Sequence, residues 1–194
     1  MDAGRPSEEV LTGQLVQLRA PRSSDTEAVH AVVDDAATRR FASTLDLPSL
    51  DAWAEPARPG LWPPGPRFAI ETLAHALTGI MLVVDLNERH GRFGDQILIL
   101  PSSRRRGYAA DAILVLLRHY FGQRDYEKCE VRILEFNEPA LQLHGRLGFI
   151  EEGRPRSSIL VEGQRWDELL LGITASEFGA LHGDSLESSG RQSD

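Results

Sequence analysis

The chain has 194 residues, 41% hydrophobic and 26% charged, which suits a globular protein with one core and a single domain. Its net charge of -8 argues against nucleic-acid binding, which needs a basic face, and mildly favours a cationic or amine-bearing partner. No apolar stretch approaches the roughly 20 residues of a membrane span, and residues 1–9 lack a signal-peptide core, so we expect no membrane association and a cytoplasmic location.

The N-terminal part predicts one strand, two helices and a long irregular connection. After a flexible N-terminus at 1–12, residues 14–20 alternate like a half-exposed strand. Ser24 caps a helix with one apolar stripe, and a second helix starts near Ala36. The stretch 47–67 is rich in proline, so we expect a long loop there.

A two-stranded meander leads into the central strand. Residues 68–73 and 78–86 have the apolar content of paired strands, and a turn at 88–91 follows them. The next run, 97–100, is apolar throughout, which predicts a strand buried on both faces. Pro101 ends this strand.

A turn rich in arginine and small residues joins the central strand to a long helix. From Ala110 the apolar residues recur at the i, i+3, i+4, i+7 spacing of one core-facing stripe, so the helix begins near Gly107. Gly107 and Ala109 are small enough for a ligand to approach the main chain of the turn at 104–109. Because a helix start offers unpaired N–H groups and a positive dipole end, this turn suits a phosphate or pyrophosphate. An ordinary turn with a solvated basic run is the alternative.

The C-terminal part predicts three more strands and one helix. Residues 130–134 form a strand, and the helix that follows runs over 137–147 with its asparagine as cap and a proline in its first turn. Residues 158–161 and 165–173 read as the last strands. The polar segment 175–194 predicts one helical turn followed by a disordered tail.

Two motifs, correctly spaced, resemble the GNAT superfamily of N-acetyltransferases. The phosphate loop of that family is matched by Arg104, Gly107 and Ala109, and its second signature by Asn137, Ala140, Leu143 and Gly148-Phe149. Residues 15–21 and 152–154 also look like the branch that contains the ribosomal-protein N-terminal alanine acetyltransferases. The resemblance covers residues 13–174 and implies one acyltransferase domain with an α/β (α+β) GNAT-like fold, a mixed, mostly antiparallel twisted sheet with helices on both faces.

The resemblance implies acetyl-CoA as the acyl donor and no metal. The family's cofactor contacts fall on the central strand, the turn and the start of the second helix, at Leu98, Ile99, Leu100, Arg104, Arg105, Arg106, Gly107, Tyr108, Ala109 and Asn137. A main-chain N–H of the strand would stabilise the charge that builds on the thioester oxygen. The acceptor pocket is implied near the long loop, with Phe41, Trp53 and Trp62 as candidate walls, unless the tryptophans only pin the loop to the core.

His144 stands where the family usually has the tyrosine that protonates the departing thiolate. An imidazole titrates near neutrality and can donate that proton, although a histidine on the helix surface is the alternative. The base is open: the branch often has a glutamate where this chain has Gly94, and the adjacent Asp95 can point to the other face of the strand. Further candidates lie near strand ends, at Glu71, Asp85 and Glu135, and a water chain would also serve.

We therefore expect an N-acyltransferase that moves an acetyl group from acetyl-CoA to a primary amine of a small molecule or a peptide N-terminus. A non-catalytic acyl-CoA-binding sensor or regulatory subunit is the first alternative, and an enzyme of nucleotide phosphates is the second. Cys129, the only cysteine, is expected to be a small core residue, and the histidines show no metal-ligand spacing. Family members often dimerise, so a homodimer is possible.

Overall fold

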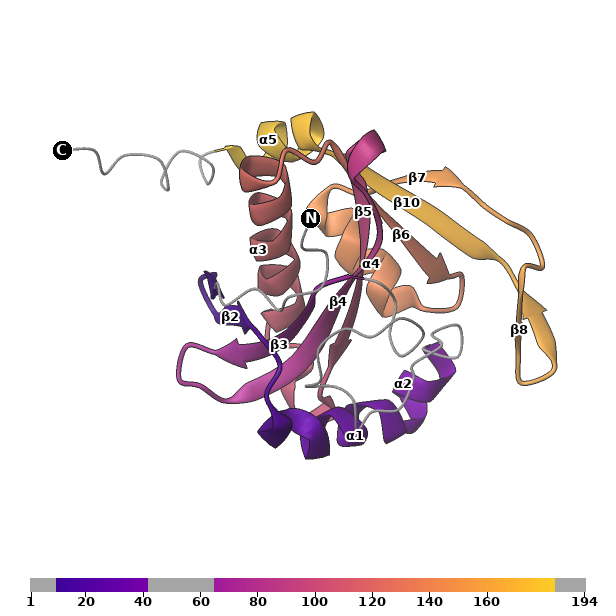
Figure 1. The fold of residues 1–194 in the computed structure, drawn as a ribbon. Coiled ribbons are helices and arrows are strands. Elements are labelled where there is room, and N and C mark those ends of the chain that lie inside the picture. Colours follow the sequence, from indigo (N-terminus) through magenta and orange to yellow (C-terminus); the bar gives the residue numbers. More distant parts are fainter. Residues whose placement is uncertain (1–9, 42–64, 184–194) are drawn as a thin grey trace.

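The computed structural model describes residues 10–41 and 65–183, and the account below is confined to them (Figure 1). An eight-stranded sheet has the order β1-β2-β3-β4-β5-β6-β10-β7, and a separate hairpin pairs β8 with β9. The strands of the large sheet are β1 (Leu11–Thr12), β2 (Val16–Arg19), β3 (Arg67–Thr72), β4 (Leu77–Asn87), β5 (Arg92–Ile99), β6 (Lys128–Leu134), β7 (Ile150–Gly153) and β10 (Glu168–Thr174). The hairpin strands are β8 (Ile159–Val161) and β9 (Gln164–Trp166).

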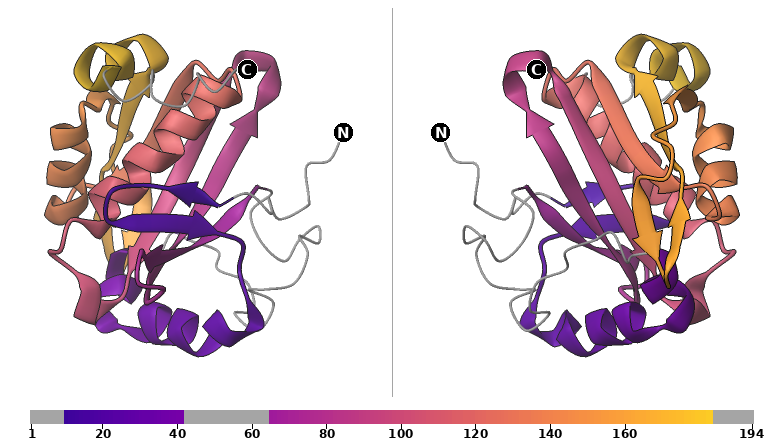
Figure 2. Two further views of the ribbon diagram at one scale, coloured as in Figure 1. Left: turned by 90° about the vertical axis from the view of Figure 1, so that its left-hand side faces the viewer. Right: turned by 90° about the vertical axis from the view of Figure 1, so that its right-hand side faces the viewer.

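Helices cover both faces of the large sheet, as the resemblance implies. The α-helices are α1 (Thr26–Asp34), α2 (Ala36–Phe41), α3 (Tyr108–Gln123), α4 (Glu138–Leu147) and α5 (Ala175–His182). Figures 1 and 2 show α1 and α2 at the end of the sheet opposite α5. Helices α3 and α4 lie along the face of the sheet that α1 does not cover. Short 3-10 turns precede α1 and α3, at Ser23–Asp25 and Pro101–Ser103.

The alternation of apolar residues along β4 and β5 explains the two-sided cover. Even-numbered residues of β4, such as Ile80 and Leu82, pack with Val29 and Val32 of α1. Odd-numbered residues, such as Met81, join the main core under α3 and α4. Because side chains of a strand alternate between faces, a strand covered on both sides must be apolar where it is covered, as residues 80–84 of β4 are.

The sheet is antiparallel except between β5 and β6, where α3 forms the crossover connection that a parallel pair requires. These two strands pair only at their starts, Arg92 with Lys128 and Phe93 with Cys129. Beyond Phe93 they diverge within the described structure, and the edge of β5 that faces β6 is left without ladder bonds to it. We call this divergence the splay.

Several sequence-based expectations differ from the structure, among them the cap of the first helix, which is Asp25 and not Ser24. The central strand starts at Arg92, and residues 97–100 are half-buried because they lie beside the splay. The predicted strand 165–173 is broken into β9 and β10, and β7 was not predicted. The predicted tail begins too early, because α5 carries Phe178 into the core with 0% exposure.

No helix in the described ranges is long and apolar enough to cross a membrane.

Candidate active site at the splay of β5 and β6

The turn between β5 and α3 has the backbone that an anion site needs. Arg105 and Gly107 have left-handed φ angles of 61° and 84°, and α3 begins at Tyr108 with Gly107 as its N-cap. A side chain on Gly107 would be strained at this φ and would meet Leu15 Cδ1 at 3.2 Å. The N–H groups of the first turn have no partner within the helix, and residues 104–107 are exposed, so the turn fits the pyrophosphate of CoA.

Arg104 does not point its charge into this turn. Its Nη2 donates to Asp35 Oδ2 at 2.7 Å and to Thr38 Oγ1 at 2.9 Å, and its Nε donates to the Ile99 carbonyl at 3.3 Å. The hydrogen bond from Arg104 is the main reason why the pKa of Asp35 is lowered. The guanidinium thus ties the turn to the junction of α1 and α2. The predicted cofactor contact of Arg104 therefore stays a prediction for its backbone, whereas Arg105 and Arg106 are exposed.

Asp111 anchors the other side of the α3 N-terminus, a role that the sequence did not indicate. Its buried carboxylate accepts backbone N–H bonds from Gln14 at 3.1 Å, Leu15 at 2.7 Å and Val16 at 2.9 Å. Gly13 leaves room for this contact, since a Cβ there would lie 2.4 Å from Asp111 Oδ2. The β1–β2 turn and the first turn of α3 are therefore one rigid unit.

The splay presents the backbone of Leu98, Ile99 and Leu100, the strand residues predicted to contact the cofactor. β5 pairs with β4 on one side through the register Ile80–Leu98 and Gly79–Ile99, and Leu100 N donates to the Thr78 carbonyl at 2.8 Å. Its other edge is open beyond Phe93, so main-chain groups along it can bind the amides of a pantetheine arm.

Asn137 is the N-cap of α4, as the sequence predicts. Its Oδ1 accepts the Ala140 N–H at 3.4 Å, and Pro139 occupies the first turn. This cap fixes the start of α4 at Glu138.

His144 lies inside the protein, which removes the helix-surface alternative. Its residue exposure is 4%, and its ring makes an edge contact with Phe149 at 4.9 Å between centroids. Nδ1 is 2.9 Å from the Ala140 carbonyl, which can only accept, so Nδ1 carries a hydrogen. Nε2 is buried and has no hydrogen-bond partner among the described residues. Nε2 is therefore the nitrogen that can exchange a proton with a ligand.

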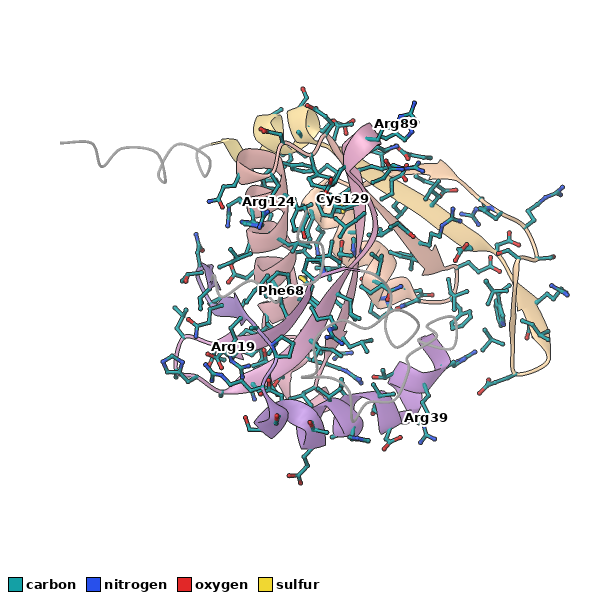
Figure 3. All side chains as sticks on the ribbon, in the orientation of Figure 1. Arg19, Arg39, Phe68, Arg89, Arg124 and Cys129 are labelled. Carbon is teal, nitrogen blue, oxygen red and sulfur yellow. The ribbon has the colours of Figure 1, made fainter. Side chains whose placement is uncertain are left out.

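Asp95 points to the face that carries α3 and α4. Cys129 Sγ lies 3.6 Å from Asp95 Oδ1 and donates its thiol hydrogen to it, and Figure 3 shows Cys129 in the interior. Burial raises the pKa of Asp95, while a charge on His144 and the Cys129 thiol act in the opposite direction. Burial and the Asp95 charge raise the pKa of the Cys129 thiol well above its usual range, so Cys129 is the inert core residue that we expected.

Gly94 explains the missing glutamate. A Cβ at this position would lie 2.6 Å from the Glu130 carbonyl oxygen and 3.1 Å from Val84 Cγ2. The backbones of β5 and β6 meet here, at the origin of the splay, and no side chain fits without moving β6.

Two of the other three carboxylates proposed as bases, Glu71 and Glu135, are engaged elsewhere, and Asp85 is exposed on β4. Glu71 is 1% exposed and bonds Arg19 through Oε2 at 2.6 Å, and its Oε1 bonds Gln17 and His75. Glu135 lies after β6, where its Oε1 accepts the Asp167 N–H at 3.0 Å. Neither contact brings the carboxylate to His144, so the structure does not group these residues with the splay.

An aromatic pair that the sequence did not single out lies beside α2. Of the predicted wall residues, Trp53 and Trp62 lie outside the described residues, and Phe41 is the last residue of α2. Phe136 and Trp166 contact edge to face at 4.6 Å. The Arg40 guanidinium lies 4.8 Å from the Phe136 ring centre, so α2, the β6–α4 turn and the β8–β9 hairpin meet at this cluster. Residues 30 positions apart gave no local signal of this contact.

Within the described ranges, no group of three or more His, Cys, Asp and Glu side chains is arranged so that it could hold a metal ion.

Comparison with known proteins identifies the family. Residues 16–150 match the family described as Acetyltransferase (GNAT) domain. The chain is 29% identical over 172 residues to the SPbeta prophage-derived uncharacterized N-acetyltransferase YokL of Bacillus subtilis, covering 89% of this chain and 97% of YokL. It is 26% identical over 112 residues to the spermidine N(1)-acetyltransferase of Vibrio cholerae, covering 58% of this chain and 65% of that enzyme.

Solved structures agree on the fold. A GNAT-family acetyltransferase from Bacillus anthracis superposes with a TM-score of 0.75 at 16% identity, covering 87% of this chain and 99% of that one. The Vibrio cholerae spermidine N-acetyltransferase in complex with CoA and spermine superposes with a TM-score of 0.71 at 21% identity, covering 84% and 97%. These relatives are not specific to the ribosomal-protein branch, so that finer resemblance is not supported. The chain belongs to the GNAT family of acetyltransferases.

Proposed function

We propose that the protein transfers an acetyl group from acetyl-CoA to a primary amine of a small molecule, by direct attack of the amine on the thioester. The main support for this proposal comes from strand β5. Its edge is open at the splay, and its end leads directly into the turn whose helix start fits a pyrophosphate. Matching of the family over 16–150 supports the same activity.

Each binding task has a group in this chain. When bound, acetyl-CoA supplies an acyl carbon activated by its thioester. The N–H groups of Tyr108 and Ala109, at the start of α3, hold phosphate oxygens, and the exposed Arg105 and Arg106 add charge around them. The open edge of β5 near Leu98 binds the pantetheine amides and donates an N–H to the thioester oxygen.

His144 serves as the acid for the departing thiolate. Its position on α4 is that of the family's tyrosine, its ring is buried, and its Nε2 is the nitrogen not engaged by the Ala140 carbonyl. Since the neutral ring carries its hydrogen on Nδ1, Nε2 must be protonated before it can donate. The acid form of this enzyme is thus the imidazolium.

A small-molecule amine is the acceptor class that we favour over a peptide N-terminus. Three of the relatives are named for spermidine, a small-molecule amine. A peptide N-terminus is the second choice, because the relatives do not favour the ribosomal-protein branch that residues 15–21 resemble. We place the reaction in the cytoplasm, where acetyl-CoA is made available.

A non-catalytic acyl-CoA sensor is the second candidate, and Gly94 favours it, since the structure leaves no room there for the glutamate that the resemblance to the ribosomal-protein branch implies. Thiol release separates the two candidates. An enzyme releases CoA when an amine is added, whereas a sensor binds acetyl-CoA without release.

The test is calorimetric titration with acetyl-CoA, with ATP and NAD as controls, followed by thiol release with spermidine, other small amines and short peptides. G107E should abolish acetyl-CoA binding, because a carboxylate would crowd the phosphate site. G163E is the matched control: Gly163 also has a left-handed φ, of 80°, but lies in the β8–β9 turn with no atom within 4 Å of an added Cβ. Equal loss of binding in both variants would contradict the placement of the cofactor.

A further inference from the structure

The face of β5 that looks toward α1 carries an amide in an otherwise apolar row. Gln96 pairs directly with Leu82 of β4, and residues opposite each other on neighbouring strands point to the same face of the sheet. Leu82 packs with α1, so Gln96 lies on the α1 side. Its neighbours along this face of β5 are Gly94, which has no side chain, and the apolar Leu98, which packs against the same cluster. Gln96 is thus a polar residue in an apolar setting.

The oxygen of this amide is unsatisfied. Gln96 Oε1 is buried and has no hydrogen-bond partner among the described residues. A buried carbonyl oxygen without a donor costs free energy, and a native structure keeps one mainly where a function needs it. The side chains next to it on this face, Leu82 and Leu98, carry no donor. Within the described part of the chain, the donor therefore has to come from water or from a ligand that displaces it.

The amide stands beside the edge of β5 to which the thioester is assigned. Leu100 N, directly after β5, donates to the Thr78 carbonyl at 2.8 Å, and the main chain of an antiparallel strand turns to alternate sides along its length. Gln96 therefore turns its main-chain groups toward β4, whereas Ile97 turns its N–H toward the splay. That N–H belongs to the peptide that joins the two residues, so the side chain of Gln96 begins one Cα away from the splay edge.

The core closes the other face of β5 to an incoming amine. On that face Ile97 and Ile99 pack against the main core, and Phe93 is 1% exposed within it. His144, the proposed acid, lies on α4, which covers the same face. We therefore expect the amine to approach the thioester from the α1 side and the thiolate to take its proton from the α4 side. Gln96 is a polar side chain on the route of the amine.

We propose that Gln96 Oε1 binds the acceptor by accepting an N–H of a primary amine, and so directs the nitrogen lone pair at the acyl carbon. An amide is uncharged, so it accepts from an amine without favouring the ammonium form, as a carboxylate would. A primary amine has one hydrogen for Gln96 and another to lose on acylation, whereas an N-methylated amine has only the hydrogen that it loses. Gln96 therefore selects primary over N-methylated amines. This inference rests on the proposed acetyl transfer.

The step is the acetyl transfer proposed above, and its atoms balance. The amine nitrogen forms a bond to the acyl carbon, and the C–S bond breaks and leaves its electron pair on sulfur. The thiolate takes a proton from the His144 imidazolium. The amine nitrogen gives one proton to water, and water returns one to His144 before the next turnover. Gln96 exchanges no proton and keeps its hydrogen bond to the N–H of the product.

The first test needs no turnover. Spermidine is titrated calorimetrically into protein saturated with CoA, which has no acetyl group and cannot react. Q96M keeps the length of the side chain and removes the acceptor oxygen, so it should weaken spermidine binding by about tenfold and change CoA affinity by less than about twofold. Q164M is the matched control, because Gln164 is exposed in the β8–β9 hairpin. Equal spermidine affinity in wild type and Q96M, or no spermidine binding by wild type, would overturn the proposal.

Urea unfolding of the protein without ligand shows whether the oxygen is unsatisfied. Replacing an unpaired buried polar group by an apolar one removes its desolvation cost. Q96M and Q96L should therefore unfold at the same urea midpoint as wild type or at a higher one. A lower midpoint in both variants would show that the amide stabilises the protein itself, and would count against a role in binding the amine.

Thiol release then tests the selectivity. Q96M should lower kcat/KM for spermidine by about tenfold, while KM for acetyl-CoA stays within about twofold of wild type. Wild type should prefer spermidine to its derivative methylated on both terminal nitrogens, and Q96M should reduce that preference. An unchanged preference would refute the inference, while thiol release by both proteins would uphold the proposed function. If wild type binds spermidine through Gln96 but releases no thiol, the proposed function fails and the amine site stands.

Discussion

Glu71 illustrates how burial can make a candidate base into a structural anchor. Its carboxylate meets Arg19 at 2.6 Å, and the same guanidinium binds Asp25 through both terminal nitrogens at 2.8 and 2.9 Å. Arg19 and Glu71 are both buried, on neighbouring strands β2 and β3, and Asp25 precedes α1. The cluster therefore fixes the direction in which α1 leaves the sheet.

The pKa of Glu71 gives the size of this effect. Burial acts to raise it, but hydrogen bonds from Arg19, His75 and Gln17 outweigh burial and lower the pKa from 4.5 to about 2. That difference corresponds to about 3 kcal/mol of unfolding free energy. Because the folded-state pKa is the lower one, this contribution is complete above the unfolded-state pKa and is lost as the pH falls toward 2. It should shrink by about half by pH 3.

We therefore expect E71Q to lower the free energy of unfolding by about 3 kcal/mol at pH 7. Urea unfolding of E71Q and wild type at several pH values between 3 and 8 measures it, and the gap between them should be constant above about pH 5.5 and narrow below it. E88Q is the control, because Glu88 is exposed. E71Q should keep its kcat at a temperature where it is folded. A stable E71Q protein with a strongly reduced kcat would refute the anchor role and make Glu71 the base.

Other predictions concern the start of α3. D111N should lower the free energy of unfolding by about 2 kcal/mol, because an amide offers one acceptor oxygen to three backbone donors. The loss should be seen as a lower urea midpoint of unfolding, and an unchanged midpoint would contradict the anchoring role of Asp111. R104Q should change acetyl-CoA affinity by less than about threefold, because this guanidinium is bonded to Asp35 and Thr38. The double variant R105A/R106A should weaken binding by about tenfold in low salt and by less in high salt, and a salt-independent loss would argue against charge as the cause.

Local patterns predicted the elements well wherever one face or one cap decided the structure. The helical stripe after Ala110 gave α3, and Asn137 gave the cap of α4. β7 was not predicted, because this edge strand of the sheet has a mostly polar and exposed sequence, IEEG. The break between β9 and β10 falls at Asp167, whose N–H is bonded to Glu135 Oε1, 32 residues away.

The same holds for the candidate site: features within one element could be predicted from the sequence, and contacts between distant elements could not. The turn at 104–109 and His144 could be placed from motif spacing, because both lie within single elements or their joints. The partners of Arg104 and Asp111 could not, since they lie 69 and up to 97 residues away. The direction of Asp95 depended on how β5 meets β6, a relation between strands that no local periodicity encodes.

Gly94 and Asp95 face opposite sides of β5, and this has a consequence for the base. A side chain at Gly94 would meet Val84, on the face that carries α1, whereas Asp95 faces α4. Asp95 is thus not a displaced version of the glutamate implied by the resemblance to the ribosomal-protein branch, and it cannot take the proton of an amine held on the α1 side. Under the proposed function, we therefore expect the acceptor to arrive as the neutral amine or to lose its proton to water.

The pH dependence should then follow the acceptor. The value of kcat/KM should rise with pH as the amine loses its proton. When one acceptor is exchanged for a less basic one of similar shape, the midpoint of this rise should move to lower pH with the pKa of the amine. A base supplied by the protein would instead keep the midpoint fixed for both acceptors. Measuring thiol release against pH with two such amines decides the matter. A fixed midpoint would show that a side chain of this protein deprotonates the amine despite the glycine at position 94.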